Sequence, residues 1–150
     1  MRLVIQRVSE ARVEIDGQSV GTIGKGLLVL CGFEAADGEQ DLDWMASKLV
    51  NMRIFTDEAG LMNLSVMDVN GDILIVSQFT LHASTKKGNR PGFVRAARPK
   101  QAIPLYENFK KKLSSLLQKP VESGQFGADM QVHLCNDGPV TILIDSQQRE

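Results

Sequence analysis

The sequence is poor in the residues on which catalytic and cofactor sites are usually built. Its 150 residues include two histidines, two cysteines, one tryptophan and one tyrosine. A hydrolase with its own nucleophile needs a base, usually a histidine held by a third group, and a zinc-type site needs three or four ligands. There is also no Walker loop and no dinucleotide-binding glycine pattern. We therefore expect no metal and no cofactor.

Long apolar runs are absent as well. No stretch approaches the roughly 20 apolar residues that span a bilayer, and residues 1–7 lack the apolar core of a signal peptide. Cys31 and Cys135 are far apart in the sequence and each lies in an apolar run, which favours free buried thiols over a disulfide. We expect a cytoplasmic protein that makes no contact with a membrane.

The charges are unevenly distributed along a chain of ordinary composition. Apolar residues make up 43% and charged residues 23%, so residues 1–150 are expected to form one domain. The net charge is −1, but residues 86–119 contain ten basic residues and one acid. Such a segment favours a surface that meets phosphate. The alternative is a solvated helix face at residues 110–112 beside a basic loop that holds Lys86, Lys87 and Arg90.

Apolar periodicity predicts an α+β fold that is mostly antiparallel. Turn signals at residues 16–17 and at the Asn-Gly pair 70–71 each predict a hairpin. We expect strands at residues 2–15, 19–23, 27–33, 64–67, 72–81, 121–122, 130–134 and 140–144. Two main helices are expected at residues 39–52 and 101–118, with Pro104 in the first turn of the second helix. Its inward residues are expected to be Ile103, Tyr106, Phe109, Leu113, Leu116 and Leu117.

Residues 136–141 interrupt the last apolar stretch with a rigid corner. Asn136 and Asp137 can cap a turn with their side chains, Gly138 permits conformations closed to other residues, and Pro139 fixes φ. An ordinary turn between two strands is the simplest interpretation. A backbone corner with a functional task is the other.

Side-chain chemistry is sparse. Thr80 and His82 lie two residues apart and could form a pair on an extended chain, but a histidine at the rim of a loop is the simpler interpretation. His133 and Cys135 share a face in the same way, without further ligands nearby for a metal.

Two motifs in this order resemble the signatures of the D-aminoacyl-tRNA deacylase family. They are residues 77–81, Ser-Gln-Phe-Thr-Leu, and residues 136–141, Asn-Asp-Gly-Pro-Val-Thr. Residues 1–8, 86–91 and 123–130 match as well, so the resemblance covers nearly the whole chain. It implies a compact, barrel-like, β-rich domain that works as a homodimer, with the active site at the subunit interface and D-aminoacyl-tRNA as substrate.

The resemblance also implies roles for individual residues. They are Ser77, Gln78, Phe79 and Thr80 in catalysis; Gly138 and Pro139, held by Arg7, as a chiral selector from the partner subunit; Phe126 and Met130 at the terminal adenosine; and Lys86, Lys87, Arg90 and the lysines at 110–112 on tRNA phosphates. From the residues alone, Phe126 and Met130 would be assigned to the core.

Hydrolysis of such an ester needs positioning and oxyanion stabilisation more than a strong nucleophile, because the ester is already activated. The resemblance implies backbone N–H donors at Phe79 and Thr80 and assistance from the ribose 2′-OH. Thr80 as a covalent nucleophile is the competing mechanism. A selector made of main chain would sense the α-carbon, so Gly-tRNA is expected to be hydrolysed too.

Two other classes of function stay open. A non-catalytic nucleic-acid-binding module could use the same basic segment. A small-molecule esterase is disfavoured by the missing triad.

Overall fold

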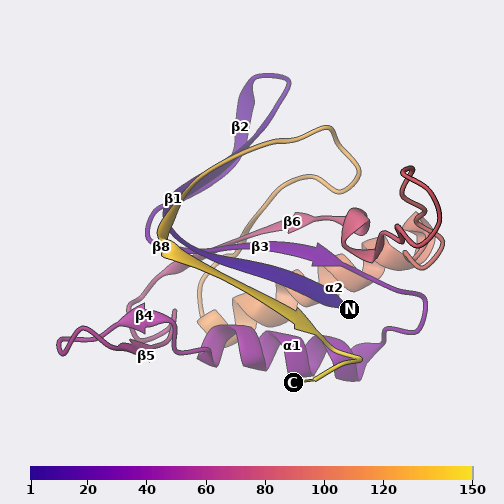
Figure 1. Cartoon of the computed structure of the whole chain (residues 1–150). Helices are drawn as coiled ribbons and strands as arrows, with labels where there is room; N and C mark the ends of the chain where they lie inside the picture. The colour runs from indigo at the N-terminus through magenta and orange to yellow at the C-terminus, as the bar shows by residue number, and fades with distance from the viewer. Residues whose placement is uncertain (150) are drawn as a thin grey trace.

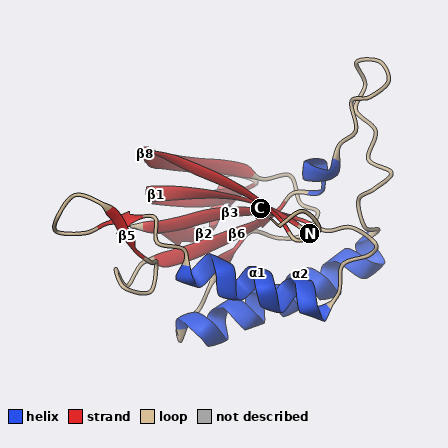
Figure 2. Cartoon of the chain, turned by 60° about the horizontal axis from the view of Figure 1, so that its bottom comes forward, coloured by secondary structure: helices blue, strands red, loops and turns tan. Residues whose placement is uncertain are grey.

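The computed structural model describes residues 1–149. Its strands and helices, in chain order, are β1 Arg2–Ile15, β2 Gln18–Ile23, β3 Gly26–Gly32, α1 Glu39–Asn51, β4 Phe55–Thr56, β5 Met62–Leu64, β6 Asp72–Ser77, the 3-10 helix η1 Phe79–His82, α2 Pro99–Leu117, β7 Glu122–Ser123 and β8 Gln131–Asp145. The two α-helices lie side by side and cover one face of the sheet (Figures 1 and 2).

Strand β1 is the centre of the sheet. It pairs antiparallel with β2, β3 and β8, and its inward residues are fully buried at Leu3, Ile5, Val8 and Val13. The strand is continuous over its predicted length, although its register against β8 shifts on both sides of Val8. The two shifts are irregular pairing within a continuous strand and not a break in it.

The sheet curls until its two ends almost meet. Its order is β2-β1-β3-β6-β7, with β8 beside β1. A Cβ added to Gly21 on β2 would lie 3.1 Å from the carbonyl oxygen of Ser123 on β7, so the ends are in contact. A mixed sheet nearly closed into a barrel, with two α-helices against it, confirms the predicted α+β, barrel-like class.

The hairpin predicted at the Asn-Gly pair 70–71 is wrong. Strand β6 pairs parallel with β3, and β5 pairs with β4 instead. The Asn-Gly pair still makes a turn, in which Asn70 has a φ of 50° and the N–H of Gly71 donates to the carbonyl of Val66 at 2.8 Å. Residues 73–76 are all buried. A strand with two buried faces gains more hydrophobic stabilisation beside β3, inside the sheet, than in a two-stranded hairpin.

Helix α1 confirms the prediction, and α2 begins two residues earlier than expected. Pro99 occupies the start of α2, so Pro104 lies in the second turn rather than the first. Tyr106, Phe109 and Leu113 are buried as expected, but Ile103 and Leu116 are 43% and 40% exposed. Ala102 belongs to the buried face of α2. Ile103 points away from this face because neighbouring positions on a helix differ by about 100°.

The two last strands predicted around residues 136–141 form one strand, β8, with a bulge. On β1 the pairing advances from Gln6 to Val8, whereas on β8 it advances from Thr141 back to Asn136. The additional residues of β8 loop out of the sheet. Among the described strands, β8 pairs with β1 alone, so Cys135 is exposed, contrary to the expected burial. Cys31 is buried, and both thiols are free.

Candidate active site

A cavity of about 270 Å³ opens at the carboxyl ends of β3 and β6. Ser77, Gln78 and Phe79 of the first motif line it together with Phe126 and Met130. The structure thus brings together residues that the sequence places about 50 positions apart. Phe126 also packs edge-to-face on Tyr106, with ring centroids 5.9 Å apart. Its side chain therefore belongs both to the cavity wall and to the edge of the core.

The cavity wall offers little acid–base chemistry. Among the described residues that line it there is no histidine, carboxylate or lysine. Cys31 lines it as well, but burial raises the pKa of the Cys31 thiol, so this sulfur stays protonated and unreactive. The arrangement can bind and orient a ligand, and its polar contributions come from Ser77, Gln78 and the main chain.

Thr80 lies beside the cavity rather than in its wall. Its hydroxyl oxygen accepts a hydrogen bond from Nε2 of Gln78 at 2.5 Å. Thr80 is exposed, and Gln78 is partly exposed. Phe79 and Thr80 open the 3-10 helix η1. The first N–H groups of such a helix have no carbonyl partner within it, so these two groups are available to an acceptor placed at the cavity mouth.

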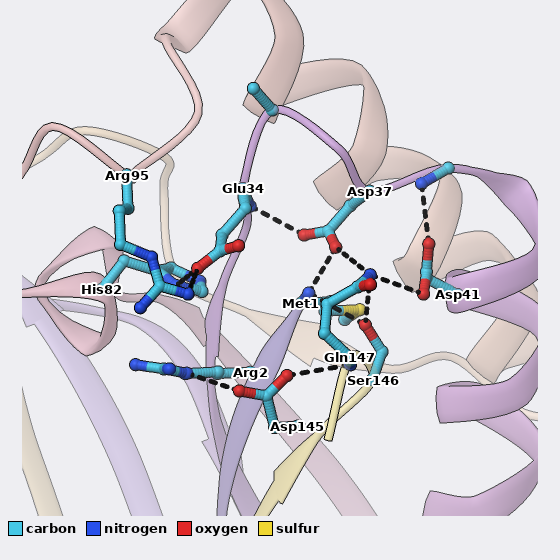
Figure 3. Close-up of polar contacts among 12 residues, drawn as sticks. Met1, Arg2, Glu34, Asp37, Asp41, His82, Arg95, Asp145, Ser146 and Gln147 are labelled. Atoms are coloured by element: carbon cyan, nitrogen blue, oxygen red, sulfur yellow. Dashed lines mark hydrogen bonds and ion pairs between the residues drawn. The ribbon is translucent and has the colours of Figure 1, made fainter. Parts of the chain in front are cut away.

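His82 is neither a rim histidine nor a partner of Thr80, which corrects both interpretations of the sequence. Its side chain is 1% exposed, and its Nδ1 lies 2.8 Å from Oε1 of Glu34. Nη2 of Arg95 lies 2.5 Å from the same oxygen, and Figure 3 shows the three side chains converging. The buried histidine thus lies against the side chain of Glu34, just after the end of β3, and not at the rim of the cavity.

The Gly138-Pro139 corner lies at the other end of β3 from the cavity. Its peptide bond is cis. Oδ1 of Asn136 accepts from the N–H of Val140 at 2.8 Å, and Nδ2 of Asn136 donates to Oγ1 of Thr141 at 3.0 Å. The predicted side-chain cap by Asn136 is therefore confirmed, and it closes the base of an exposed bulge.

Arg7 holds this bulge against the body of the protein. Its Nε donates to the carbonyl of Asp137 at 2.9 Å and its Nη1 donates to the carbonyl of Ile54 at 2.6 Å. The arginine is 8% exposed. Its planar fork reaches two segments that are remote in sequence, which a lysine could not do with the same geometry.

Lys86, Lys87 and Arg90 lie in an exposed loop between η1 and α2. The lysines of α2 are placed differently. Nζ of Lys112 lies 2.5 Å from both Glu39 and Asp43 of α1, and the hydrogen bonds from these carboxylates raise the pKa of Lys112. Lys110 donates to Oγ of Ser123 at 2.7 Å, so only Lys111 of the three has the exposure of a solvated face.

Within residues 1–149, no three His, Cys, Asp or Glu side chains form a group suited to a metal ion. In the same part of the chain, no helix has the length and apolarity that a membrane crossing requires.

Sequence reasoning missed Glu34, Phe93 and Arg95. Glu34 is the first charged residue after the apolar strand β3, and Phe93 is the single aromatic residue of a polar, basic loop. Each of these two residues differs in chemical character from its neighbours in the sequence, and this difference could have identified both.

The family model described as D-Tyr-tRNA(Tyr) deacylase matches residues 4–145. The chain is 66% identical to a protein of Akkermansia muciniphila and 61% identical to one of Dechloromonas aromatica. A protein of Flavobacterium johnsoniae is 59% identical. All three carry the name D-aminoacyl-tRNA deacylase, and in each case both chains are covered completely.

The solved structures that are similar to this one include the following two. The first, titled c-Myc DNA Unwinding Element Binding Protein, has a TM-score of 0.92 and 42% identity over 97% of this chain and 98% of that chain. The second, titled as a probable eukaryotic D-amino acid tRNA deacylase, has a TM-score of 0.82 at 20% identity over 95% and 97%, and shows the fold alone. On the family match and the curated relatives, the chain belongs to the D-Tyr-tRNA(Tyr) deacylase family.

Proposed function

We propose that the protein hydrolyses the ester bond of D-aminoacyl-tRNA and releases the free D-amino acid and tRNA. The observation that carries the proposal is the cavity itself. It combines Ser77, Gln78 and Phe79 with Phe126 and Met130, and the described residues of its wall include no histidine, carboxylate or lysine. Such a site suits an ester that is already activated and needs orientation more than a strong nucleophile.

In the proposed mechanism the main chain stabilises the developing charge. Water adds to the ester carbonyl, and the N–H groups of Phe79 and Thr80 donate to the resulting oxyanion. The bond to the 3′ oxygen then breaks, and the neighbouring ribose 2′-OH assists proton transfer to that oxygen. The terminal adenine lies against Phe126 and Met130, and the loop with Lys86, Lys87 and Arg90 meets backbone phosphates.

Chirality is read by a second copy of the chain. The protein acts as a homodimer in which Gly138 and Pro139 of one subunit reach the cavity of the other. The exposure of the bulge and its distance along β3 from the cavity of its own chain support this arrangement. Fixed main-chain atoms at the α-carbon exclude an L side chain but accept a hydrogen there, so Gly-tRNA is a substrate as well.

The decisive experiment compares D-Tyr-tRNA, L-Tyr-tRNA and Gly-tRNA with the purified protein. Release of D-tyrosine and glycine with L-Tyr-tRNA left intact is expected. Equal turnover of both tyrosyl isomers would contradict the chiral reading, and inertness toward Gly-tRNA alone would show that the selector needs the D side chain.

Thr80 as a covalent nucleophile is tested separately. The Thr80 hydroxyl accepts a hydrogen bond from Gln78, and the described residues that line the neighbouring cavity include no histidine, carboxylate or lysine, so Thr80→Ala is expected to keep most of the activity. D-Tyr-tRNA that ends in 2′-deoxyadenosine should be hydrolysed at least about 100-fold more slowly, as expected for loss of a group that assists proton transfer. Collapse of Thr80→Ala activity with tRNA binding intact would instead favour the threonine mechanism.

A non-catalytic nucleic-acid-binding module is the second candidate. The similar structure whose title names a DNA-element-binding protein favours it. Tight binding of tRNA or DNA without turnover of D-Tyr-tRNA would support the module, and turnover of simple aryl esters would point to a small-molecule esterase.

A further inference from the structure

Two phenylalanines form an exposed aromatic pair at the rim of the cavity. The rings of Phe79 and Phe93 are 5.0 Å apart at an interplanar angle of 73°, and the residues are 56% and 37% exposed. Phe79 also lines the cavity. Exposed aromatic surface beside a pocket is a common feature of interaction sites.

The pair is fixed in place by one carboxylate. His82 belongs to the same 3-10 turn as Phe79, and Arg95 follows Phe93 by two residues. Nδ1 of His82 and Nη2 of Arg95 lie 2.8 and 2.5 Å from Oε1 of Glu34 (Figure 3). The segments that carry the two rings therefore share an anchor, and the rings are oriented before any ligand arrives.

Main-chain hydrogen bonds close the loop between the two rings. Ser84 and Gly92 donate their N–H groups to each other's carbonyls at 2.7 and 2.9 Å, and the N–H of Ala97 donates to the carbonyl of Phe33 at 2.8 Å. A loop held at its neck and at its end presents its side chains with little entropy left to lose on binding.

Positive charge surrounds the pair. Residues 83–98 contain five lysines and arginines and no acid, and Lys86, Lys87 and Arg90 are exposed. Aromatic rings next to a cationic groove are how proteins hold single-stranded nucleic acid, with bases stacked on rings and phosphates on cations.

We infer that Phe79 and Phe93 form a stacking subsite for the unpaired nucleotide that precedes the terminal adenosine. The inference rests on the proposed function, in which the aminoacyl adenosine fills the cavity. The next base along the strand then emerges at the rim, where the edge-to-face packing leaves ring surface free. The phosphate between the two nucleotides faces the basic loop.

The test measures Phe93→Ala on two substrates, D-Tyr-tRNA and D-tyrosyl-adenosine, which lacks the preceding nucleotide. We expect KM for D-Tyr-tRNA to rise between about 5-fold and 100-fold, the range of base–aromatic stacking, while the constants for D-tyrosyl-adenosine stay unchanged. Val94→Ala is the matched control, because Val94 is 95% exposed beside Phe93 but carries no ring. Phe93→Tyr should restore KM.

Three results would overturn the inference. Unchanged KM for D-Tyr-tRNA in Phe93→Ala would show that no base stacks there. An equal loss on both substrates, or a weaker self-association of Phe93→Ala in sedimentation, would assign the ring to cavity shape or to a second copy of the chain.

The same variants can be compared without turnover. Binding of a CCA trinucleotide should weaken in Phe93→Ala and not in Val94→Ala, whereas adenosine binding should be equal in all. This separates the two proposals: a wild-type protein without deacylase activity defeats the proposed function, and equal trinucleotide binding defeats the stacking subsite.

Discussion

At the residue scale, charged side chains in this protein hold backbone segments in place rather than line the cavity. Glu34 ties η1 to the basic loop through His82 and Arg95, and Arg7 ties the bulge of β8 to Ile54. Arg2 does the same for the end of β8 by binding Asp145 at 2.8 Å. The charged residues act on the candidate site through the main chain that they position.

The Arg2–Asp145 pair predicts a pH-dependent stability. Partial burial acts to raise the pKa of Asp145, but the hydrogen bond from Arg2, aided by the N–H of Gln147, outweighs burial and leaves the pKa below its ordinary value. The folded state therefore favours the carboxylate. Its contribution is complete above the unfolded pKa of about 4 and is lost as the pH falls through the lower, folded pKa.

We expect Asp145→Asn to lower the free energy of unfolding at pH 7 by at most about 1 kcal/mol, since the pair is partly exposed. The difference from wild type should shrink as the pH falls below about 4. Urea unfolding of both proteins between pH 7 and pH 2.5 measures it. A difference that stays constant at low pH would mean that the charge of Asp145 is not the cause.

At the scale of elements, the bulge of β8 combines a backbone conformation that favours glycine with close packing. Gly138 has a φ of +140°, and an added Cβ would lie 2.8 Å from Cγ2 of Val140 and 2.9 Å from Nη2 of Arg7. A larger residue would displace the arginine that also holds Ile54. The shape of the bulge thus depends on glycine as much as on proline.

Gly138→Ala is expected to lower the free energy of unfolding by about 1–3 kcal/mol and kcat/KM for D-Tyr-tRNA by at least about 10-fold, as for a misplaced positioning group. Chemical unfolding and single-turnover kinetics measure the two effects. Gly17→Ala is the matched control, because Gly17 in the β1–β2 hairpin also has positive φ, +76°, but has open space around it. Wild-type kinetics in Gly138→Ala would exclude a role for the bulge in catalysis.

At the scale of the whole molecule, the excess of positive charge is only partly available to a ligand. Residues 86–119 carry +9 and the rest of the chain −10. Lys112 and Lys119 are bound by carboxylates within the chain, whereas Lys86, Lys87 and Arg90 are exposed. Phosphate contacts are therefore expected at the loop rather than along α2.

Binding of tRNA should weaken steeply with salt because each phosphate contact releases counterions. Replacing Lys86, Lys87 and Arg90 together by glutamine should reduce the slope of log K against log salt by about 2. Lys112→Gln removes the same kind of charge from a lysine bound within the chain and should change the slope little. An equal effect of both changes would place phosphates along α2 as well.

The proposed sharing of the site between subunits predicts complementation. Ser77→Phe is expected to fill the cavity, and Gly138→Ala is expected to damage the proposed selector of the partner's site. When the two variants are mixed and allowed to exchange, half of the dimers are mixed and each has one intact site, so about a quarter of the sites should recover. Sedimentation measures the dimer, and absence of recovery in mixed dimers would place each site within one chain.

The local pattern of the sequence was sufficient for much of the fold. Strands β1, β2 and β3, the turn after β1 and helix α1 lie where periodicity and turn residues put them, because these signals act between near neighbours. The two motifs also sufficed to indicate the family. The order of residues in each motif is specific to the family, even though side-chain chemistry alone does not reveal the roles of these residues.

Pairing between distant segments was decided only in the tertiary structure. The Asn-Gly pair 70–71 permits a hairpin, yet β6 joins β3, because burial on two faces outweighs a local turn preference. Residues 136–141 read as a turn between two strands, and they form a bulge because both flanking halves find the same partner, β1. His82 lies inside the protein next to Glu34, which is 48 positions earlier in the sequence and comes close to it only in the folded chain.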